Sequence, residues 1–193
     1  MPLLLLKELP RYECLLEAAR QFPDLDPSAA EAFLHLLRTG DEAFRVVESN
    51  LAGHHLTQGR FGVLMALWGS CHEAHDQAAP LSPAELAERT GVTRATITGL
   101  VDTLERDGLV TRTPDPDDRR MLAVGLTARG EKLLQKVLPS HFRQLAQLME
   151  PLSEAERKTL VRLLTKVLHR AAEIAPDVSL AAEPVHRPFA ATR

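Results

Sequence analysis

The chain has 193 residues, 45% hydrophobic and 25% charged, which excludes a protein that is disordered throughout. No apolar run approaches the ~20 residues that span a bilayer, and two cysteines are too few for a disulfide framework, so we expect a cytoplasmic protein. The net charge of −3 combines −9 over residues 1–118 with +6 over residues 119–193, so any surface for nucleic acid must be local.

The first part of the chain predicts helices separated by proline and glycine. Apolar residues recur at helical spacing in three segments, at residues 3–22, 28–52 and 57–75. Pro10 interrupts the first segment, and a linker at 23–27 is bracketed by two prolines. Thr57 can cap the third helix.

Residues 81–126 predict two short helices followed by a β-hairpin. Ser82 and Glu85 have the spacing of a capping box, and Gly91 can end this helix in the left-handed conformation. Thr93 can then cap the second helix. The elements predicted after Gly91 are a helix at 93–107 and strands at 109–113 and 121–126, which flank a turn-rich loop.

This order is that of a winged helix-turn-helix domain, and the register supports it. Ala87 is small where the two helices would cross, Gly91 makes the turn, and Ile97 faces back into the core. The predicted buried side consists of apolar residues: Leu86, Val92, Ile97, Leu100, Val101, Leu104, Leu109, Leu122, Val124 and Leu126.

The outward face of the second helix is polar and short-chained, as a recognition helix in the major groove requires. We expect Thr93, Arg94, Thr96 and Thr98 to contact DNA, with Arg94 donating two hydrogen bonds to guanine. Gly99 is unfavourable inside a helix. It would serve either a close approach to DNA or tight packing against the neighbouring helix.

The loop between the strands predicts a second contact with DNA. Arg119 and Arg120 lie at its tip, where they can reach a narrow minor groove, and Asp117 can orient Arg119. Six arginines between Arg89 and Arg120 are matched by six acidic residues, so we expect modest non-specific affinity.

Two long helices and a tail complete the chain. Thr127 can cap a helix to about residue 150. Ser153 and Glu156 form a second capping box, which opens a helix to about residue 174.

Two motifs resemble the wing signature of the MarR (multiple-antibiotic-resistance regulator) family. They read Asp117-Asp118-Arg119-Arg120 and Leu126-Thr127-Ala128-Arg129-Gly130, and the likeness extends from about residue 29 to 172. The resemblance implies an obligate homodimer, joined by its first and last helices, that binds a pseudo-palindrome with half-sites about one helical turn apart. It implies the 93–107 helix in successive major grooves and Arg119 in the flanking minor grooves.

We therefore expect a mostly α fold. It consists of a winged helix-turn-helix domain and a helical dimerisation domain built from N- and C-terminal helices, plus an extra N-terminal helix. The expected divisions are the extra helix at 1–22, dimerisation and scaffold helices at 23–78, the DNA-binding domain at 79–128, C-terminal dimerisation helices at 129–175, and a tail at 176–193.

The predicted function is a sequence-specific DNA-binding transcriptional regulator without enzymatic activity. Many members of the resembled family are repressors released by small phenolic or aromatic ligands, so we expect a homodimeric repressor of this kind. The alternatives are a winged-helix module that binds proteins, and a redox or metal sensor on the same fold.

The effector would bind between the dimer helices and the wing domain. The candidate ligand-binding residues are Arg38, His54, His55, Phe61, Met65 and Trp68. Arg38 and Arg45 share a helix face and would hold a carboxylate or make salt bridges in the dimer. The paired histidines suit a pocket or a pH sensor, whereas the last three residues also fit a core stripe.

The sequence predicts neither a cofactor nor a metal site. His72 and His75 are three residues apart instead of the four that a zincin helix needs. We expect Cys14 and Cys71 to be small buried hydrophobic residues. Peroxide-sensing relatives carry a cysteine where this chain reads Ala32-Phe33-Leu34.

Overall fold

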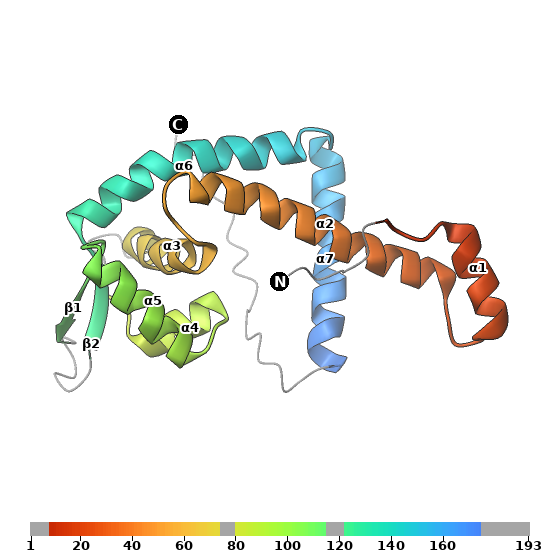
Figure 1. Ribbon diagram of the computed structural model, residues 1–193, viewed down its shortest axis with the longest axis horizontal. Helices are drawn as coiled ribbons and strands as arrows, with labels where there is room; N and C mark the ends of the chain where they lie inside the picture. Colours follow the sequence, from red (N-terminus) through yellow and green to blue (C-terminus); the bar gives the residue numbers. More distant parts are fainter. Residues whose placement is uncertain (1–7, 74–79, 115–121, 175–193) are drawn as a thin grey trace. The chain divides into compact units, whose positions relative to one another are not determined.

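The computed structural model describes residues 8–73, 80–114 and 122–174, with side chains from residue 70 to 73 left aside (Figure 1). Within these ranges it contains seven helices and two strands, which confirms the mostly α prediction. The elements are α1 (Tyr12–Gln21), α2 (Pro27–Ala52), α3 (Gln58–Glu73), α4 (Pro83–Thr90), α5 (Arg94–Arg106), β1 (Val110–Pro114), β2 (Leu122–Leu126), α6 (Ala128–Met149) and α7 (Glu154–Ile174). The chain forms two compact units, residues 1–54 and 55–193.

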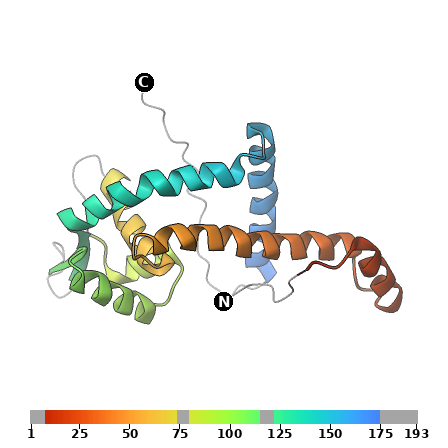
Figure 2. The same ribbon diagram turned by 45° about the horizontal axis from the view of Figure 1, so that its top comes forward.

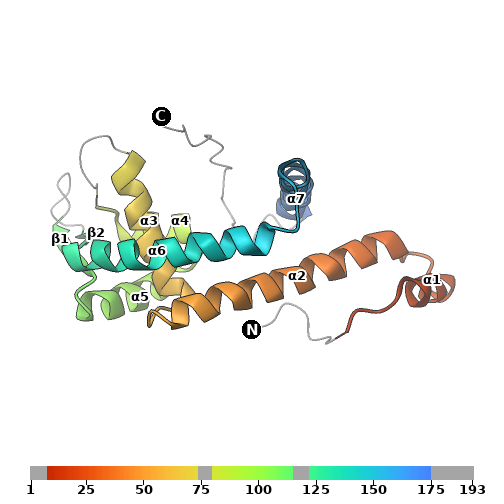
Figure 3. The same ribbon diagram turned by 90° about the horizontal axis from the view of Figure 1, so that it is seen from above.

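The first unit consists of α1 and α2, with α1 lying against the start of α2 (Figure 3). The prediction of a helix from residue 3 is wrong over residues 8–11, because α1 begins only at Tyr12. Pro10 explains the late start, since the residue before a proline avoids helical backbone and Arg11 is itself extended.

Helix α2 has a well-defined first turn. The Asp26 carboxylate accepts hydrogen bonds from the backbone N–H groups of Ser28 and Ala29, and Pro27 takes the first helical position. The bonds from Ala29 and Ser28 lower the pKa of Asp26. The predicted helix at 28–52 is confirmed to within one residue.

The second unit has one apolar core, to which α3, α4, α5, α6 and the hairpin all contribute. Its largest fully buried side chains are Val63, Leu64, Leu67, Leu86, Ile97, Val101, Leu104, Val110, Val124, Leu134 and Val137. Two residues predicted to be buried are exposed, Val92 at 36% and Leu122 at 50%. Val92 lies in the turn between α4 and α5, and Leu122 lies at the open end of β2, so neither reaches the core.

The turn between α4 and α5 has the predicted geometry. Ser82 and Glu85 form the capping box, and Gly91 is left-handed with φ of 67°. The N–H of Val92 donates to the carbonyl of Ala87 at 3.2 Å, which closes the end of α4. This geometry fixes the direction in which α5 leaves the turn.

The wing strands β1 and β2 lie side by side (Figure 2). They pair antiparallel, with Val110 opposite Leu126 and Pro114 opposite Leu122. Leu81, just before α4, adds a further bridge to β2. Its N–H donates to the carbonyl of Val124 at 2.9 Å and its carbonyl accepts from the N–H of Val124 at 2.8 Å. The base of the wing is therefore tied to the start of the helix-turn-helix.

The start of α6 is locked to the base of the wing. Thr127 caps α6 by accepting from the N–H of Gly130, and its hydroxyl donates to the carbonyl of Gly108 at 2.7 Å. A Cβ at Gly130 would lie 2.2 Å from the carbonyl oxygen of Leu109. Only glycine fits here, so the fold requires the glycine that ends the Leu-Thr-Ala-Arg-Gly motif.

Helix α7 has no buried residue. Its capping box is confirmed, because Ser153 and Glu156 exchange backbone and side-chain hydrogen bonds. Its exposed apolar residues are Leu160, Val161, Leu163, Leu164, Val167, Leu168 and Ile174. Over the described ranges, no helix is both long enough and apolar enough to cross a membrane.

Candidate nucleic-acid interface

The four residues expected to read DNA lie together at the start of α5. Thr93, Arg94, Thr96 and Thr98 are all exposed, whereas Ile97 between them is fully buried. The helix is thus anchored by one face and presents the other to solvent. This arrangement is the one that a recognition helix needs.

Internal hydrogen bonds limit what the threonine hydroxyls can offer. The Thr93 hydroxyl accepts from the N–H of Thr96 at 3.2 Å and lies 2.9 Å from the Thr96 hydroxyl. The Thr98 hydroxyl donates to the carbonyl of Arg94 at 3.0 Å. Thr93 therefore acts chiefly as the N-cap of α5. Among the four side chains, Arg94 is the longest that can donate hydrogen bonds to DNA.

An ion-pair cluster that the sequence analysis missed joins α5 to the wing. Arg112 on β1 forms ion pairs with Asp102 and Glu105 on α5, and its backbone N–H donates to Glu105 at 3.2 Å. The hydrogen bond to Asp102, followed by the bond to Glu105, raises the pKa of Arg112. Asp102 lies on the outward face of α5, but it serves to hold the wing.

A further ion pair fastens α3 to the C-terminal end of α5. Arg60 on α3 pairs with Asp107, the C-cap of α5. A Cβ at Gly59 would lie 3.2 Å from the Leu100 side chain, so the two helices approach closely there. No local pattern in the sequence points to this ion pair, because 47 residues separate its partners.

Gly99 has no close neighbour in the described ranges that would require a glycine. A Cβ placed on Gly99 would meet no atom of the described residues within 4 Å, so packing against a neighbouring helix is wrong. Glycine in a helix interior is about 1 kcal/mol less stable than alanine. Within the described residues, nothing in the fold accounts for this glycine.

The predicted wing-tip residues Asp117, Arg119 and Arg120 lie outside the described residues. The strands that lead to the tip are described up to Pro114 and from Leu122. A role of the tip in the minor groove therefore stays a prediction.

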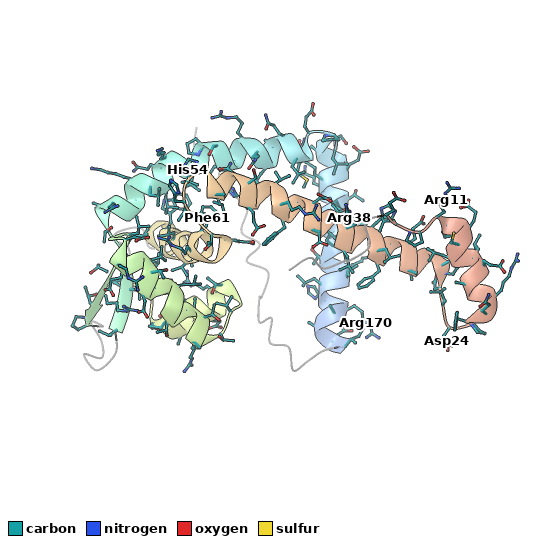
Figure 4. All side chains as sticks on the ribbon, in the orientation of Figure 1. Arg11, Asp24, Arg38, His54, Phe61 and Arg170 are labelled. Carbon is teal, nitrogen blue, oxygen red and sulfur yellow. The ribbon has the colours of Figure 1, made fainter. Side chains whose placement is uncertain are left out.

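The candidate ligand residues divide between the two units. Arg38 lies on α2 (Figure 4). It pairs with Glu42 at 2.7 Å, and Arg45 pairs with the same carboxylate at 3.2 Å. These pairs lie within one helix. Both expected roles of Arg38 and Arg45, holding a carboxylate and forming salt bridges in a dimer, stay predictions.

The other candidates lie in the segment that connects α2 to α3 and along α3. His54 is half-buried, and His55 is exposed with φ of 56°, the only non-glycine residue with positive φ in the described ranges. On α3, Phe61 is buried, and Met65 and Trp68 are half-buried.

A buried polar pair on α6 was not found from the sequence. The His141 ring is 4.9 Å from the Phe61 ring in a T-shaped contact, and His141 is 9% exposed. His141 Nδ1 and Gln144 Oε1 are buried without a hydrogen-bond partner among the described residues. Burial lowers the pKa of His141, so its ring is neutral at neutral pH. A lone histidine in an amphipathic helix gives no signal by which it could be predicted.

Only some of the residues considered for metal or redox chemistry lie in the described ranges. No group of three His, Cys, Asp or Glu side chains in the described ranges is placed to hold a metal ion. Cys14 is exposed, which corrects the expectation that it is buried. The side chains of Cys71, His72 and His75 lie outside the described part of the chain.

The sequence is similar to those of known transcriptional regulators. The sequence profile of the MarR family matches residues 73–121. The transcriptional repressor YetL of Bacillus subtilis is 38% identical over 165 residues, which cover 86% of this chain and 95% of that protein.

Two solved structures share the fold over most of their length. A mutant of Escherichia coli MarR, solved with operator DNA, is 25% identical with a TM-score of 0.61, covering 78% of this chain and 96% of that one. Bordetella bronchiseptica BpsR is 28% identical with a TM-score of 0.58, covering 69% and 90%. The structure of BpsR is reported as explaining how 6-hydroxynicotinic acid regulates its DNA binding.

Proposed function

Since the chain belongs to the MarR family of winged-helix transcriptional regulators, we propose that it is a homodimeric repressor whose hold on its operator is released by a small aromatic ligand. The family relationship accounts for a regulator rather than an enzyme. Repression by this chain rests on the likeness to YetL, which is named a repressor.

The observation that carries the proposal is the exposed start of α5 on a rigidly held helix. Arg94 reads a guanine in the major groove, with Thr96 and Thr98 beside it, while Thr93 fixes the first turn against the DNA backbone. Arg119, oriented by Asp117 and assisted by Arg120, contacts the flanking minor groove. The likeness to MarR solved with operator DNA supports this mode.

The exposed apolar face of α7 supports the homodimer. Six of its exposed apolar residues lie between Leu160 and Leu168, within about two and a half turns of helix. A contiguous apolar face of this kind marks an interaction surface. In the proposed dimer, α7 and the N-terminal helices of two copies bury it, so residues 23–78 and 129–175 are dimerisation elements and 79–128 binds DNA.

For the ligand, we propose a small aromatic molecule bound near Phe61, Met65 and Trp68, with Arg38, His54 and His55 as further candidates. The regulation of BpsR by 6-hydroxynicotinic acid supports an aromatic effector. The His141 ring, in a T-shaped contact with Phe61, adds a further aromatic group beside the proposed site.

Binding to DNA upstream of the chain's own gene tests the regulator directly. Fluorescence anisotropy at two salt concentrations should show tight, salt-dependent binding to that DNA and weak binding to random DNA. Arg94→Ala should lose about 1–3 kcal/mol of discrimination at one base pair, whereas Arg119→Ala should weaken binding at the flanks.

Arg106→Ala is the matched control, because Arg106 lies at the far end of the same helix. Equal binding of the Arg94 and Arg119 variants and the wild type on both DNAs would contradict the proposed mode. Aromatic acids and phenols, including 6-hydroxynicotinic acid, are then titrated into the complex. If none lowers DNA affinity at saturation, the ligand part of the proposal fails while the DNA part stands.

A further inference from the structure

Gly99 is the residue of the recognition helix that the fold itself leaves unexplained. It lies in the interior of α5, on the side opposite the buried residues Ile97 and Val101. Gly99 is exposed, as are its neighbours on that side, Ala95 and Thr98. The helix therefore presents its glycine to whatever α5 contacts.

Each structural reason for a glycine fails at this position. Positive φ is found at Gly91 and Gly108 among the described glycines, and Gly99 has ordinary helical backbone. Close packing requires glycine at Gly130, where a Cβ would meet a carbonyl, but a Cβ at Gly99 would meet none of the described atoms within 4 Å. Alanine would stabilise the free protein here, so the constraint comes from a bound partner.

The partner follows from the proposed function, on which this inference rests. With the first turn of α5 in the major groove, Gly99 lies one turn beyond Arg94 and Ala95 and faces the same groove. At Gly99 the helix can approach a base edge more closely than at any residue with a Cβ, by about the width of a methyl group.

The chemistry around Gly99 selects the kind of base edge. Ala95 offers a methyl group, and the Thr98 hydroxyl donates its hydrogen to the carbonyl of Arg94 at 3.0 Å. Hydrogen-bonding groups of a base would find few partners on such a surface. The 5-methyl group of thymine is the apolar group that projects into the major groove. We infer that Gly99 receives the 5-methyl group of one thymine in each half-site.

The test pairs a methyl group added to the protein with one removed from the DNA. A duplex is first selected from a random library with the full-length wild-type protein, and each thymine is then replaced in turn by deoxyuridine, which lacks only the 5-methyl group. For the wild type, we expect one position per half-site at which this replacement weakens binding about fourfold.

Gly99→Ala should raise the melting temperature by roughly 2–4 °C and weaken binding to the selected duplex about tenfold. On the duplex with deoxyuridine at the sensitive position, binding by the variant should recover most of that loss. Gly62→Ala on α3 is the matched control, because a Cβ there also meets no described atom within 4 Å. It should raise stability without changing DNA affinity.

Three results would overturn the inference: unchanged DNA affinity of Gly99→Ala, a loss that deoxyuridine rescues at no position, or a selected duplex in which no thymine methyl matters. A wild-type protein that binds no DNA sequence selectively would refute the proposed function itself, and with it this inference. The two failures are thus distinguished by the wild-type arm alone.

Discussion

At the scale of single residues, the polar groups of this domain divide into those that hold the fold and those that face outward. The Thr93 hydroxyl caps α5 and the Thr98 hydroxyl donates to the carbonyl of Arg94, so part of the hydrogen-bonding capacity of both side chains is used within the helix. Arg112 likewise holds the wing through Asp102 and Glu105. Residue type and exposure predict which face meets DNA, but only the hydrogen bonds show which atoms remain for the contact.

His141 should make the stability of the protein depend on pH. Burial lowers its pKa, so the unfolded chain binds the proton more readily than the folded chain does. The stability that the neutral ring contributes is present above about pH 6.5, the pKa of an unfolded histidine, and is lost as the pH falls through the lower folded-state value. The melting temperature should therefore drop between pH 7 and pH 5, and His141→Leu should reduce this drop.

His169→Gln is the control, because His169 lies on the exposed helix α7. This variant should keep the pH slope of the wild type. If the melting temperature of His141→Leu depends on pH as the wild type does, His141 does not cause the pH dependence.

At the scale of elements, most helices and strands can be predicted from the sequence because capping residues and glycines mark their ends. Ser82, Thr127 and Ser153 cap the helices as predicted, and Gly91 ends α4. The contacts between elements were not predictable. The Arg60–Asp107 pair depends on how α3 crosses α5, and the exposure of Leu122 depends on where the hairpin leaves the core. Local propensity encodes neither of these facts.

The ion pairs of Arg112 should stabilise the wing measurably. Arg112→Leu removes both pairs and leaves two acidic side chains beside each other, so we expect a loss of about 1 kcal/mol and a melting temperature lower by roughly 2–4 °C. Affinity for DNA should fall as well, because Asp102 and Glu105 would lose their neutralising partner. Differential scanning calorimetry and anisotropy measure the two effects.

Arg170→Ala removes an exposed pair within α7 and serves as the control for charge. It should change the melting temperature and the DNA affinity little. An Arg112 variant with wild-type values in both measurements would reject the structural role of the cluster.

The contact at Gly130 predicts a larger effect. In Gly130→Ala, the added Cβ would lie 2.2 Å from the carbonyl of Leu109, so backbone must move to make room. We expect a loss of about 1–3 kcal/mol and a fall in melting temperature of roughly 5 °C. Thermal unfolding followed by circular dichroism measures this change.

Gly125→Ala on β2 is the matched control, because a Cβ there meets nothing within 4 Å in the described part of the chain. Its melting temperature should stay near that of the wild type. Equal stability of the two variants would argue against a tight contact at Gly130.

At the scale of the whole molecule, α7 exposes a contiguous set of apolar side chains, which the proposed dimer would bury. Leu164→Glu places a charge among Leu160, Val161 and Leu168. In the proposed dimer this charge would be buried without a partner, so the dimer should dissociate and operator binding should be lost. Sedimentation velocity at micromolar concentration distinguishes monomer from dimer.

Arg162→Glu provides the control, since it places a glutamate on the same helix at an exposed polar position. This variant should stay dimeric. If Leu164→Glu also remains a dimer, α7 is not the interface.

The lock at the start of α6 has a mechanical consequence. Thr127 and Gly130 join the first turn of α6 to the wing base, and the helix continues for 22 residues, about 33 Å at 1.5 Å per residue. Because α6 is joined firmly to the wing base, a small tilt of α6 at its α7 end would displace the hairpin at its other end. In a dimer, the distance between the two wings would then depend on the angle between the two α6 helices.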